Sequence, residues 1–355
     1  MLIRPIEHDD LDALAAIAVE TGAGFTSLPD NRAFLENKIA QAQAAFHAAT
    51  NEPADAENAA LYFFLAEDDE LTHATRAERI AGCCAIEARV GLDVPFYNYR
   101  VGRLAQAAPQ LDLHRVIDTL FLSSDHTGDA EVGSLFLREP WRGGSARNAA
   151  LLSQMRWLFM ATFREHFPDR VLAEMRGRFD NAQVNPFWEA LGAHFFPIDF
   201  SRADQLTGLG QKRFIGELMP RYPICTAMLP QAARDCIGQV HKQTQPALAM
   251  LRAQGLRFEG YIDIFDAGPT VEAYLDDVRA VRHSRTVTVT GIDEQASEPA
   301  SPRALATSTG DPAAFRATWV GRTPTDPDST GVILHPHEAN RLNVSTGDTV
   351  RILTD

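Results

Sequence analysis

The chain has 355 residues, of which 45% are hydrophobic and 23% charged, and its formal net charge is −14. This composition excludes a mostly disordered chain, and the length favours two domains or one domain with an appendage. The acidic balance argues against a general nucleic-acid binder, because binding a phosphate backbone requires clustered Lys and Arg.

Cysteine spacing and the first residues of the chain are typical of a cytoplasmic protein. The cysteines form no C-x-x-C pair, so we expect reduced thiols rather than a zinc or redox site. Residues 1–5 lack the features of a secretory signal, and no run of ~20 apolar residues predicts a membrane span. His335 and His337 alternate beside a predicted helix start, which is more typical of a surface than of a metal site. We therefore expect no metal, no membrane and no nucleic acid as partners.

Two helices and a group of short strands are predicted in the first part of the chain. Apolar periodicity and turn residues predict a strand over 2–6, a helix after Asp9 or Asp10, a helix over 32–48, and strands over 61–65, 79–87, 97–101, 119–122 and 132–137. Because these strands are short and separated by turn residues, we expect a mainly antiparallel central sheet.

A glycine-containing turn, Trp141 to Arg147, precedes the longest predicted helix, over 148–167. The order of strand, glycine turn and helix start is typical of an anion site, because free backbone N–H groups and the helix dipole point toward the ligand. Arg142 and Arg147 flank the turn, so the segment could hold a pyrophosphate. The alternative is that the glycines serve only the geometry of the connection.

Two further polar segments allow both a structural and a functional interpretation. Residues 123–128, Ser-Ser-Asp-His-Thr-Gly, contain the residue types of a hydrolase, but adjacent residues rarely form a triad, so we interpret them as a polar turn. Glu174 and Arg176 end a strand predicted over 170–175, and their spacing places them on one face. They could form an ion pair, or either could meet a zwitterionic substrate.

His241 lies just before a helix that we expect to begin near residues 245–247. Pro246 is favoured in a first helical turn, and Thr244 or Gln245 could cap it. The positive end of the helix dipole disfavours a second positive charge, so we expect a neutral imidazole near pH 7. A neutral imidazole can accept or relay a proton. From this pattern alone, a surface-loop histidine remains the alternative.

The last part of the chain predicts a linker and a small module. Residues 291–314 are rich in Ala, Ser, Pro, Thr and acidic residues, so we expect a flexible linker there. Strand patterns around a short helix over 337–342 then predict a small β-rich C-terminal module over 315–355.

A series of motifs runs in order from the N-terminus to about Val289. They are Leu2-Ile3-Arg4-Pro5, Thr26-Ser27-Leu28-Pro29, residues 97–102 (YNYRVG), 120–128 (LFLSSDHTG), 173–177 (AEMRG), 199–204 (DFSRAD), 238–241 (GQVH) and 261–270 (YIDIFDAGPT). This series resembles the bacterial arginine N-succinyltransferases. So many matches in the same order make the resemblance specific.

The resemblance implies a fold and a reaction. It implies an α/β (α+β) acyl-CoA N-acyltransferase fold of the GNAT-like type, with a central mixed sheet flanked by helices. Residues 1–205 would form the GNAT-like acyltransferase domain, and residues 206–290 a second α/β part carrying the catalytic histidine. The implied reaction transfers a succinyl group from succinyl-CoA to the α-amino group of L-arginine.

The resemblance also implies roles for individual residues and partners. His241 would be the catalytic proton donor, and Leu135 would contact succinyl-CoA through its backbone, with Arg142 and Arg147 near the pyrophosphate. Succinyl-CoA would be a co-substrate, with no permanently bound cofactor, and L-ornithine a further substrate. Relatives that work as paired unlike subunits imply a homo- or hetero-oligomer.

The chain departs from the family pattern at two places. The turn before Leu151-Leu152-Ser153 is two residues longer and has Arg147-Asn148-Ala149 in place of a late glycine pair, and Lys242 replaces the proline after the histidine. The altered turn motivates an alternative, a non-catalytic partner subunit of a heteromeric arginine/ornithine succinyltransferase. Another alternative is a GNAT-like transferase with a different acyl donor or amine.

Recognition of a guanidinium group calls for a carboxylate in bidentate geometry. The sequence offers six candidates without distinguishing among them: Glu87, Glu174, Asp199, Asp204, Asp263 and Asp266.

Overall fold

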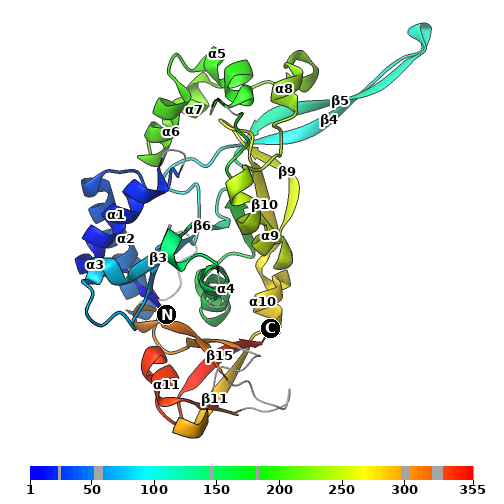
Figure 1. Cartoon of the computed structure of the whole chain (residues 1–355). Coiled ribbons are helices and arrows are strands. Elements are labelled where there is room, and N and C mark those ends of the chain that lie inside the picture. Colours follow the sequence, from blue (N-terminus) through cyan, green and yellow to red (C-terminus); the bar gives the residue numbers. More distant parts are fainter. Residues whose placement is uncertain are drawn as a thin grey trace.

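A long mixed sheet runs through the chain from end to end (Figure 1). The computed structural model describes residues 1–22, 25–51, 59–143, 147–180, 182, 184–296, 304–321 and 331–354. Within these ranges, fifteen strands pair in the order β14-β11-β15-β12-β13-β1-β2-β3-β6-β7-β10-β9-β4-β5-β8. Among them only β6–β7 and β11–β14 are parallel pairs, so the expected mixed, mainly antiparallel sheet is confirmed.

The strands are short except for one hairpin, β4–β5, which projects from the body of the molecule (Figure 1). They are β1 (Leu2–Pro5), β2 (Leu61–Glu67), β3 (Ile80–Glu87), β4 (Asn98–Ala108), β5 (Leu113–Ser123), β6 (Ala130–Leu137), β7 (Arg170–Glu174), β8 (Ile224–Cys225), β9 (Arg257–Asp263), β10 (Pro269–Tyr274), β11 (Arg285–Ile292), β12 (Ala304–Ser308), β13 (Ala317–Val320), β14 (Gly331–Leu334) and β15 (Thr349–Thr354).

Helices cover the sheet and its upper end. They are α1 (Leu11–Thr21), α2 (Arg32–Asn51), α3 (Arg76–Arg79), α4 (Asn148–Thr162), α5 (Ala193–Phe195), α6 (Phe200–Gly208), α7 (Arg213–Leu218), α8 (Gln231–Arg234), α9 (Gln245–Ala253), α10 (Arg279–His283) and α11 (Pro336–Leu342). The helix expected over 148–167 ends earlier, at Thr162, and a single 3-10 turn follows it. None of the described helices is long and apolar enough to cross a membrane.

The centre of the sheet is buried on both faces. Phe63 and Leu65 of β2 belong to the cluster that packs with α1, whereas Tyr62 and Phe64 contact α4. The rings of Phe64 and Phe159 lie 5.0 Å apart. Strands covered on both faces are continuously apolar, and β2 has this pattern.

Strands β6 and β7 separate soon after they meet. They pair at only two positions, Ala130 with Val171 and Glu131 with Leu172. On its other edge β6 is bulged against β3, where Ser134 has a φ of 49°. The C-terminal half of β6 therefore has no partner in β7, and an opening is left between the two strands.

The chain between 206 and 290 completes the main sheet. Strand β10 pairs with β7, and β9 pairs with β4. The boundary expected between residues 205 and 206 falls inside α6. The segments on either side of it therefore share one sheet, because their strands alternate in it.

The C-terminal module begins earlier than expected. Strands β11 to β15 and α11 share one apolar cluster, so the module starts at residue 285 rather than 315. The predicted linker 291–314 is wrong over 304–314, because β12 lies buried there between β15 and β13. Its sequence, Ala-Leu-Ala-Thr-Ser, contains small residues that pack closely but carry little strand signal. Residues 297–303 lie outside the described part of the chain.

Candidate active site

His241 is held against the end of β7 by its backbone. Its N–H donates to the Arg176 carbonyl at 2.8 Å, whereas the preceding Met175 N–H donates to Pro269 on the β10 side. Successive residues of an extended segment direct their polar backbone groups to opposite edges. The carbonyl of Arg176 therefore points away from β10. His241, which binds that carbonyl, lies on the side of β7 where β6 is its neighbour and where the two strands separate.

The turn before α9 orients the His241 ring. Its Nδ1 accepts a hydrogen bond from the Gln243 N–H at 3.2 Å, so the proton of the neutral ring is on Nε2. Helix α9 begins at Gln245 with Pro246 in its first turn, as predicted, but Thr244 makes no side-chain cap. The histidine side chain caps the preceding turn instead. The half-buried ring thus presents Nε2–H as its remaining polar group.

The surroundings of His241 favour the neutral imidazole. Burial lowers its pKa, and the nearby charges of Arg176 and Lys242 lower it further. The expected neutral ring agrees with this direction, but the physical cause differs from the helix dipole that the sequence suggested. Of the two cations, only Lys242 was recognised from the sequence.

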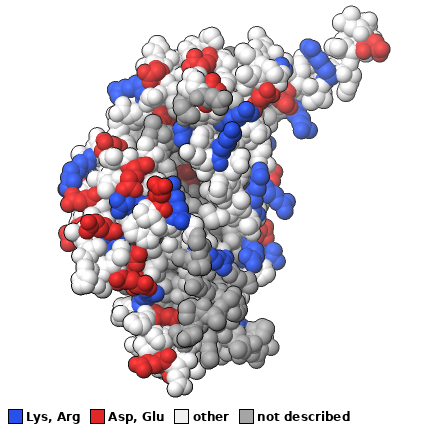
Figure 2. Space-filling view, in the orientation of Figure 1, with Lys and Arg blue, Asp and Glu red and all other residues white. Residues whose placement is uncertain are grey.

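Two glutamates lie together where β6 and β7 part. Burial and the charge of Glu87 raise the pKa of Glu131 to about 7. Burial and the charge of Glu131 hold the pKa of Glu174 well above its usual range, and Lys212 opposes both shifts. Both glutamates are half-buried. A cation bound between them would favour their charged forms. The face in Figure 2 is hollowed near its centre, with acidic and basic side chains around the hollow.

A chain of polar contacts fixes Glu174. Asn98 Nδ2 donates to Glu174 Oε1 at 2.8 Å, and Asn98 Oδ1 lies 2.8 Å from His126 Nδ1. His126 Nε2 lies 2.6 Å from Glu272, which Arg170 binds at 2.7 Å. This series of polar contacts links β4, β7 and β10 with the turn after β5. Several elements of the sheet therefore set the position of the Glu174 carboxylate.

Sequence reasoning missed His126, because it interpreted residues 123–128 as a polar turn. The side chain of His126 is fully buried, and Tyr261 packs on its ring with the centroids 4.4 Å apart. The residues around it do form a turn, with Thr127 Oγ1 donating to the Ser124 carbonyl. The available signal was a histidine inside one of the ordered motifs, 120–128.

Glu174 and Arg176 do not form the ion pair that their spacing suggested. Arg176 lies over the Phe179 ring at 4.8 Å, and its Nε is buried without a hydrogen-bond partner among the described residues. Because neither charge neutralises the other, both are available to the two ends of a zwitterion.

The other carboxylate candidates have structural partners. Asp199 caps α6 by accepting from the Arg202 N–H, and Asp204 lies within the same helix. Asp263 accepts backbone N–H groups of the 263–268 turn, and Asp266 accepts from Gly177 and Gly268. Glu87 and Glu174 therefore remain from the original set. Glu131, which the sequence did not single out, joins them.

Leu135 lies at the bulge of β6, beside the opening. Cys84 of β3 stands opposite Ser134 and Leu135, because the register of the two strands shifts there. The Leu135 side chain is half-buried against the cluster that contains residues of α4. Its backbone is on β6 beyond the last residue that pairs with β7, and its contact with succinyl-CoA stays a prediction.

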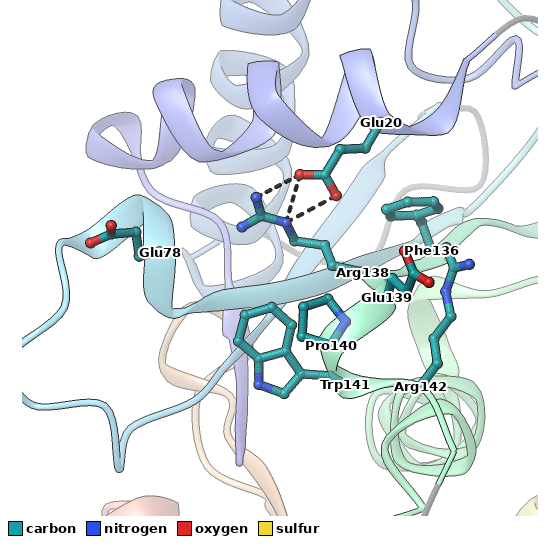
Figure 3. A pocket seen from close by; sticks show the side chains of 8 residues that line it. All are labelled: Glu20, Glu78, Phe136, Arg138, Glu139, Pro140, Trp141 and Arg142. Carbon is teal, nitrogen blue, oxygen red and sulfur yellow. Dashed lines mark hydrogen bonds and ion pairs between the residues drawn. The ribbon is translucent and has the colours of Figure 1, made fainter.

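The turn after β6 borders a cavity of about 550 Å³ (Figure 3). Arg138 crosses the cavity wall to pair with Glu20, and the Arg142 Nε donates to the Leu137 carbonyl at 2.6 Å. Arg147 lies over the Trp319 ring at 5.1 Å. The turn residues 144–146 lie outside the described part of the chain, so pyrophosphate binding at this turn stays a prediction.

Metal-ligating side chains are scattered in the described part of the chain. No cluster of three or more His, Cys, Asp or Glu side chains with suitable geometry occurs in the described ranges. His335, one of the two alternating histidines, caps α11 through its Nδ1, which accepts from the His337 N–H.

Known proteins match this chain along nearly its whole length. Residues 1–280 match the family described as arginine N-succinyltransferase beta subunit, and residues 285–354 match the C-terminal domain of that family. Proteins named arginine N-succinyltransferase from Escherichia coli and Escherichia fergusonii are each 45% identical over 353 residues, covering 99% of this chain and 97% of the relative.

A solved structure extends the likeness to three dimensions. The arginine/ornithine succinyltransferase subunit AI from Pseudomonas aeruginosa superposes with a TM-score of 0.85 at 32% identity, covering 99% of this chain and 98% of that one. The family match starts its second segment at residue 285, where the C-terminal module begins in the fold. The chain therefore belongs to the arginine N-succinyltransferase family.

Proposed function

We propose that this chain transfers the succinyl group of succinyl-CoA to the α-amino group of L-arginine, giving N2-succinyl-L-arginine and CoA. The observation that carries the proposal is the position of His241 at the opening between β6 and β7, close in the chain fold to the paired carboxylates Glu131 and Glu174. Membership of the family supports the choice of donor and acceptor.

His241 is proposed as the proton donor. The amine nitrogen, after losing a proton, attacks the thioester carbonyl carbon; the C–S bond then breaks, and the leaving thiolate takes a proton. Nε2–H is the group left for the substrate, because Nδ1 accepts the Gln243 N–H in the resting site. The neutral ring donates a hydrogen bond from Nε2 to the oxyanion. Once Nδ1 has taken up the proton that the amine releases, the imidazolium gives its Nε2 proton to the leaving sulfur. Lys242 and Arg176 keep the resting ring neutral.

The charges around the opening suit a cationic amino acid. Glu131 and Glu174 are proposed to meet its positive groups, and Arg176, which lacks a carboxylate partner in the described residues, its α-carboxylate. This assignment leaves L-ornithine as a second acceptor, because ornithine presents the same zwitterion and a terminal ammonium group.

The donor is proposed to lie along β6. Leu135 would bind the pantetheine amide through backbone groups that have no partner in β7, and Arg142 and Arg147 would border the pyrophosphate at the start of α4. Succinyl-CoA acts here as a substrate, and the proposed chemistry needs no resident cofactor.

Release of CoA tests the proposal. The purified chain should release CoA from succinyl-CoA only when arginine or ornithine is present, and His241→Ala should reduce kcat by about 100-fold or more. His114→Ala is a matched control, because His114 is exposed near the start of β5, where it pairs with Ala107 of the projecting hairpin. Normal turnover by His241→Ala would remove this residue from the mechanism.

A partner-subunit role is the second candidate, and the Pseudomonas relative is itself called a subunit. If the isolated chain binds neither succinyl-CoA nor arginine but gains both properties with a second chain, the subunit role replaces the first proposal. Homo- or hetero-oligomer formation would be measured in the same experiment by light scattering.

A further inference from the structure

Arg156 of α4 is a buried cation without an anionic partner. The residue is 1% exposed, and two of its nitrogens donate only to Ser153, Nε to the carbonyl and Nη2 to Oγ, each at 3.3 Å. No carboxylate pairs with it among the described residues. The neighbours that favour its charge are the Cys84 thiol and the Trp157 ring, whose centroid lies 6.0 Å from the guanidinium carbon. Burial raises the pKa of Cys84 to about 12, so that thiol is neutral and cannot balance the charge.

An unpaired charge in a protein interior is strongly unfavourable unless something else compensates it. Arginine cannot escape the penalty by losing its proton, because its intrinsic pKa is too high. The third nitrogen, Nη1, makes no hydrogen bond within the described chain, yet it is not among the buried atoms that lack a partner. The guanidinium therefore keeps N–H donors beyond those that Ser153 accepts.

The guanidinium lies near the bulge of β6. Cys84, which interacts with Arg156, stands opposite Ser134 and Leu135, where the register of β3 and β6 shifts. The Leu135 side chain packs on the same face of the sheet as Cys84, which is the face covered by α4. The guanidinium thus approaches from beneath the point where β6 loses its β7 partner.

We infer that Arg156 binds the terminal carboxylate of the succinyl group and thereby selects a dicarboxylic acyl donor. The inference rests on the proposed function, which places the thioester at the opening. A carboxylate is the anion that fits, because two parallel N–H···O bonds match a guanidinium. The pyrophosphate of CoA does not compete for this position, because Arg156 lies eight residues into α4, ~12 Å along the helix from its start.

Acyl groups of equal length test the inference. Butyryl-CoA has the same four-carbon chain as succinyl-CoA and replaces only the carboxylate with a methyl group. The wild-type protein should favour succinyl-CoA over butyryl-CoA in kcat/KM by about 100-fold, and Arg156→Met should abolish that preference while turning over butyryl-CoA at least as well. Arg156→Met that keeps the preference overturns the inference, as does a wild type without any preference.

Two controls separate the inference from the proposed function. If the wild type transfers no succinyl group to arginine, the proposed function fails; if it does so and Arg156→Met remains selective, only the inference fails. Protection against heating gives an independent reading, because succinyl-CoA should raise the melting temperature of the wild type more than butyryl-CoA does. Arg156→Lys, which keeps the charge, replaces the methionine variant where that variant does not fold. It should lose part of the preference, and an unchanged preference overturns the inference.

Discussion

Arg4 and Arg156 are both buried arginines, but their surroundings differ. Arg4 donates to both oxygens of Asp10 at 2.7 and 2.9 Å and to Glu67 at 2.7 Å. Arg76 adds a further bond to Asp10 at 2.6 Å. Arg156 has only two long bonds to Ser153. The charge of Arg4 is balanced by carboxylates within the folded chain. The charge of Arg156 has no carboxylate beside it among the described residues.

At the acidic residues of the opening, unlike at Asp10, cations do not outweigh the effect of burial on the pKa. Burial raises the pKa of Asp10 on its own, but hydrogen bonds from Arg4 and Arg76 outweigh it and lower the pKa to about 2. The pKa values of Glu131 and Glu174 are raised instead, because burial dominates. A nearby carboxylate adds repulsion in each case, Glu87 for Glu131 and Glu131 for Glu174. We therefore interpret the paired charges as part of the fold. We interpret the ionisable groups that lack an opposite charge as candidates for contact with a ligand.

The largest loss of folding stability is expected when the buried Arg4–Asp10 pair is broken. Asp10→Ala leaves Arg4 buried with one carboxylate fewer, and removing one partner of a buried pair costs about 3–5 kcal/mol. Urea unfolding followed by circular dichroism measures this loss. Asp12→Ala is the matched control, because the Asp12–Arg32 pair is exposed on both sides and should contribute less than about 1 kcal/mol. Equal losses in the two variants would remove the distinction between the groups.

Removing a carboxylate at the opening should affect catalysis more than folding. Glu174→Gln keeps the hydrogen bond to Asn98 but loses the charge, so kcat/KM for arginine should fall about 10- to 100-fold. The dissociation constant of succinyl-CoA, measured by calorimetry, should not change. Glu165→Gln, at an exposed position after α4, serves as the control. Unchanged kcat/KM for arginine in Glu174→Gln would place the cation elsewhere.

A smaller effect is expected on the pH dependence of stability. The folded chain holds a proton on Glu131 up to about pH 7, whereas the unfolded chain releases it near 4.5. The folded state therefore binds more protons between these values, and the free energy of unfolding falls as the pH rises through that window. Glu131→Gln should match the wild type near pH 4.5 and exceed it by about 1–2 kcal/mol at pH 8. A wild-type stability that rises from pH 5 to 7, with no gain in the variant, contradicts this.

The sequence predicted the secondary structure better where a buried face repeats along the chain than where small residues pack closely. The β1 strand, α1 and the central strands followed from apolar periodicity, because a buried face repeats every few residues. The start of α9 followed from Pro246. The roles of His241 and Leu135 came only from the family resemblance and stay predictions. The linker prediction failed at β12, because small residues that suit a crowded sheet centre resemble linker composition.

Contacts between distant segments escaped sequence reasoning altogether. The link from Arg170 to Glu174 through His126 joins four elements, and no spacing in the sequence indicates that Asn98 reaches a residue 76 positions away. The same holds for Arg156, whose position in an apolar helix predicts neither its burial nor the lack of a carboxylate beside it. Such facts depend on tertiary packing, which local patterns do not encode.

The smallest expected effect concerns the charge beside His241. Lys242 helps to lower the pKa of His241, but burial and Arg176 contribute more, and the Lys242 side chain is exposed to screening by solvent. Lys242→Gln should therefore shift the acidic limb of the kcat/KM profile upward only slightly, and less at high salt. Arg176→Gln should shift it further and also weaken arginine binding, because that guanidinium has no carboxylate of its own within the described chain. An equal shift in both variants would mean that His241 senses the two cations alike, and Arg176 would then lose its distinction as a group left for the substrate.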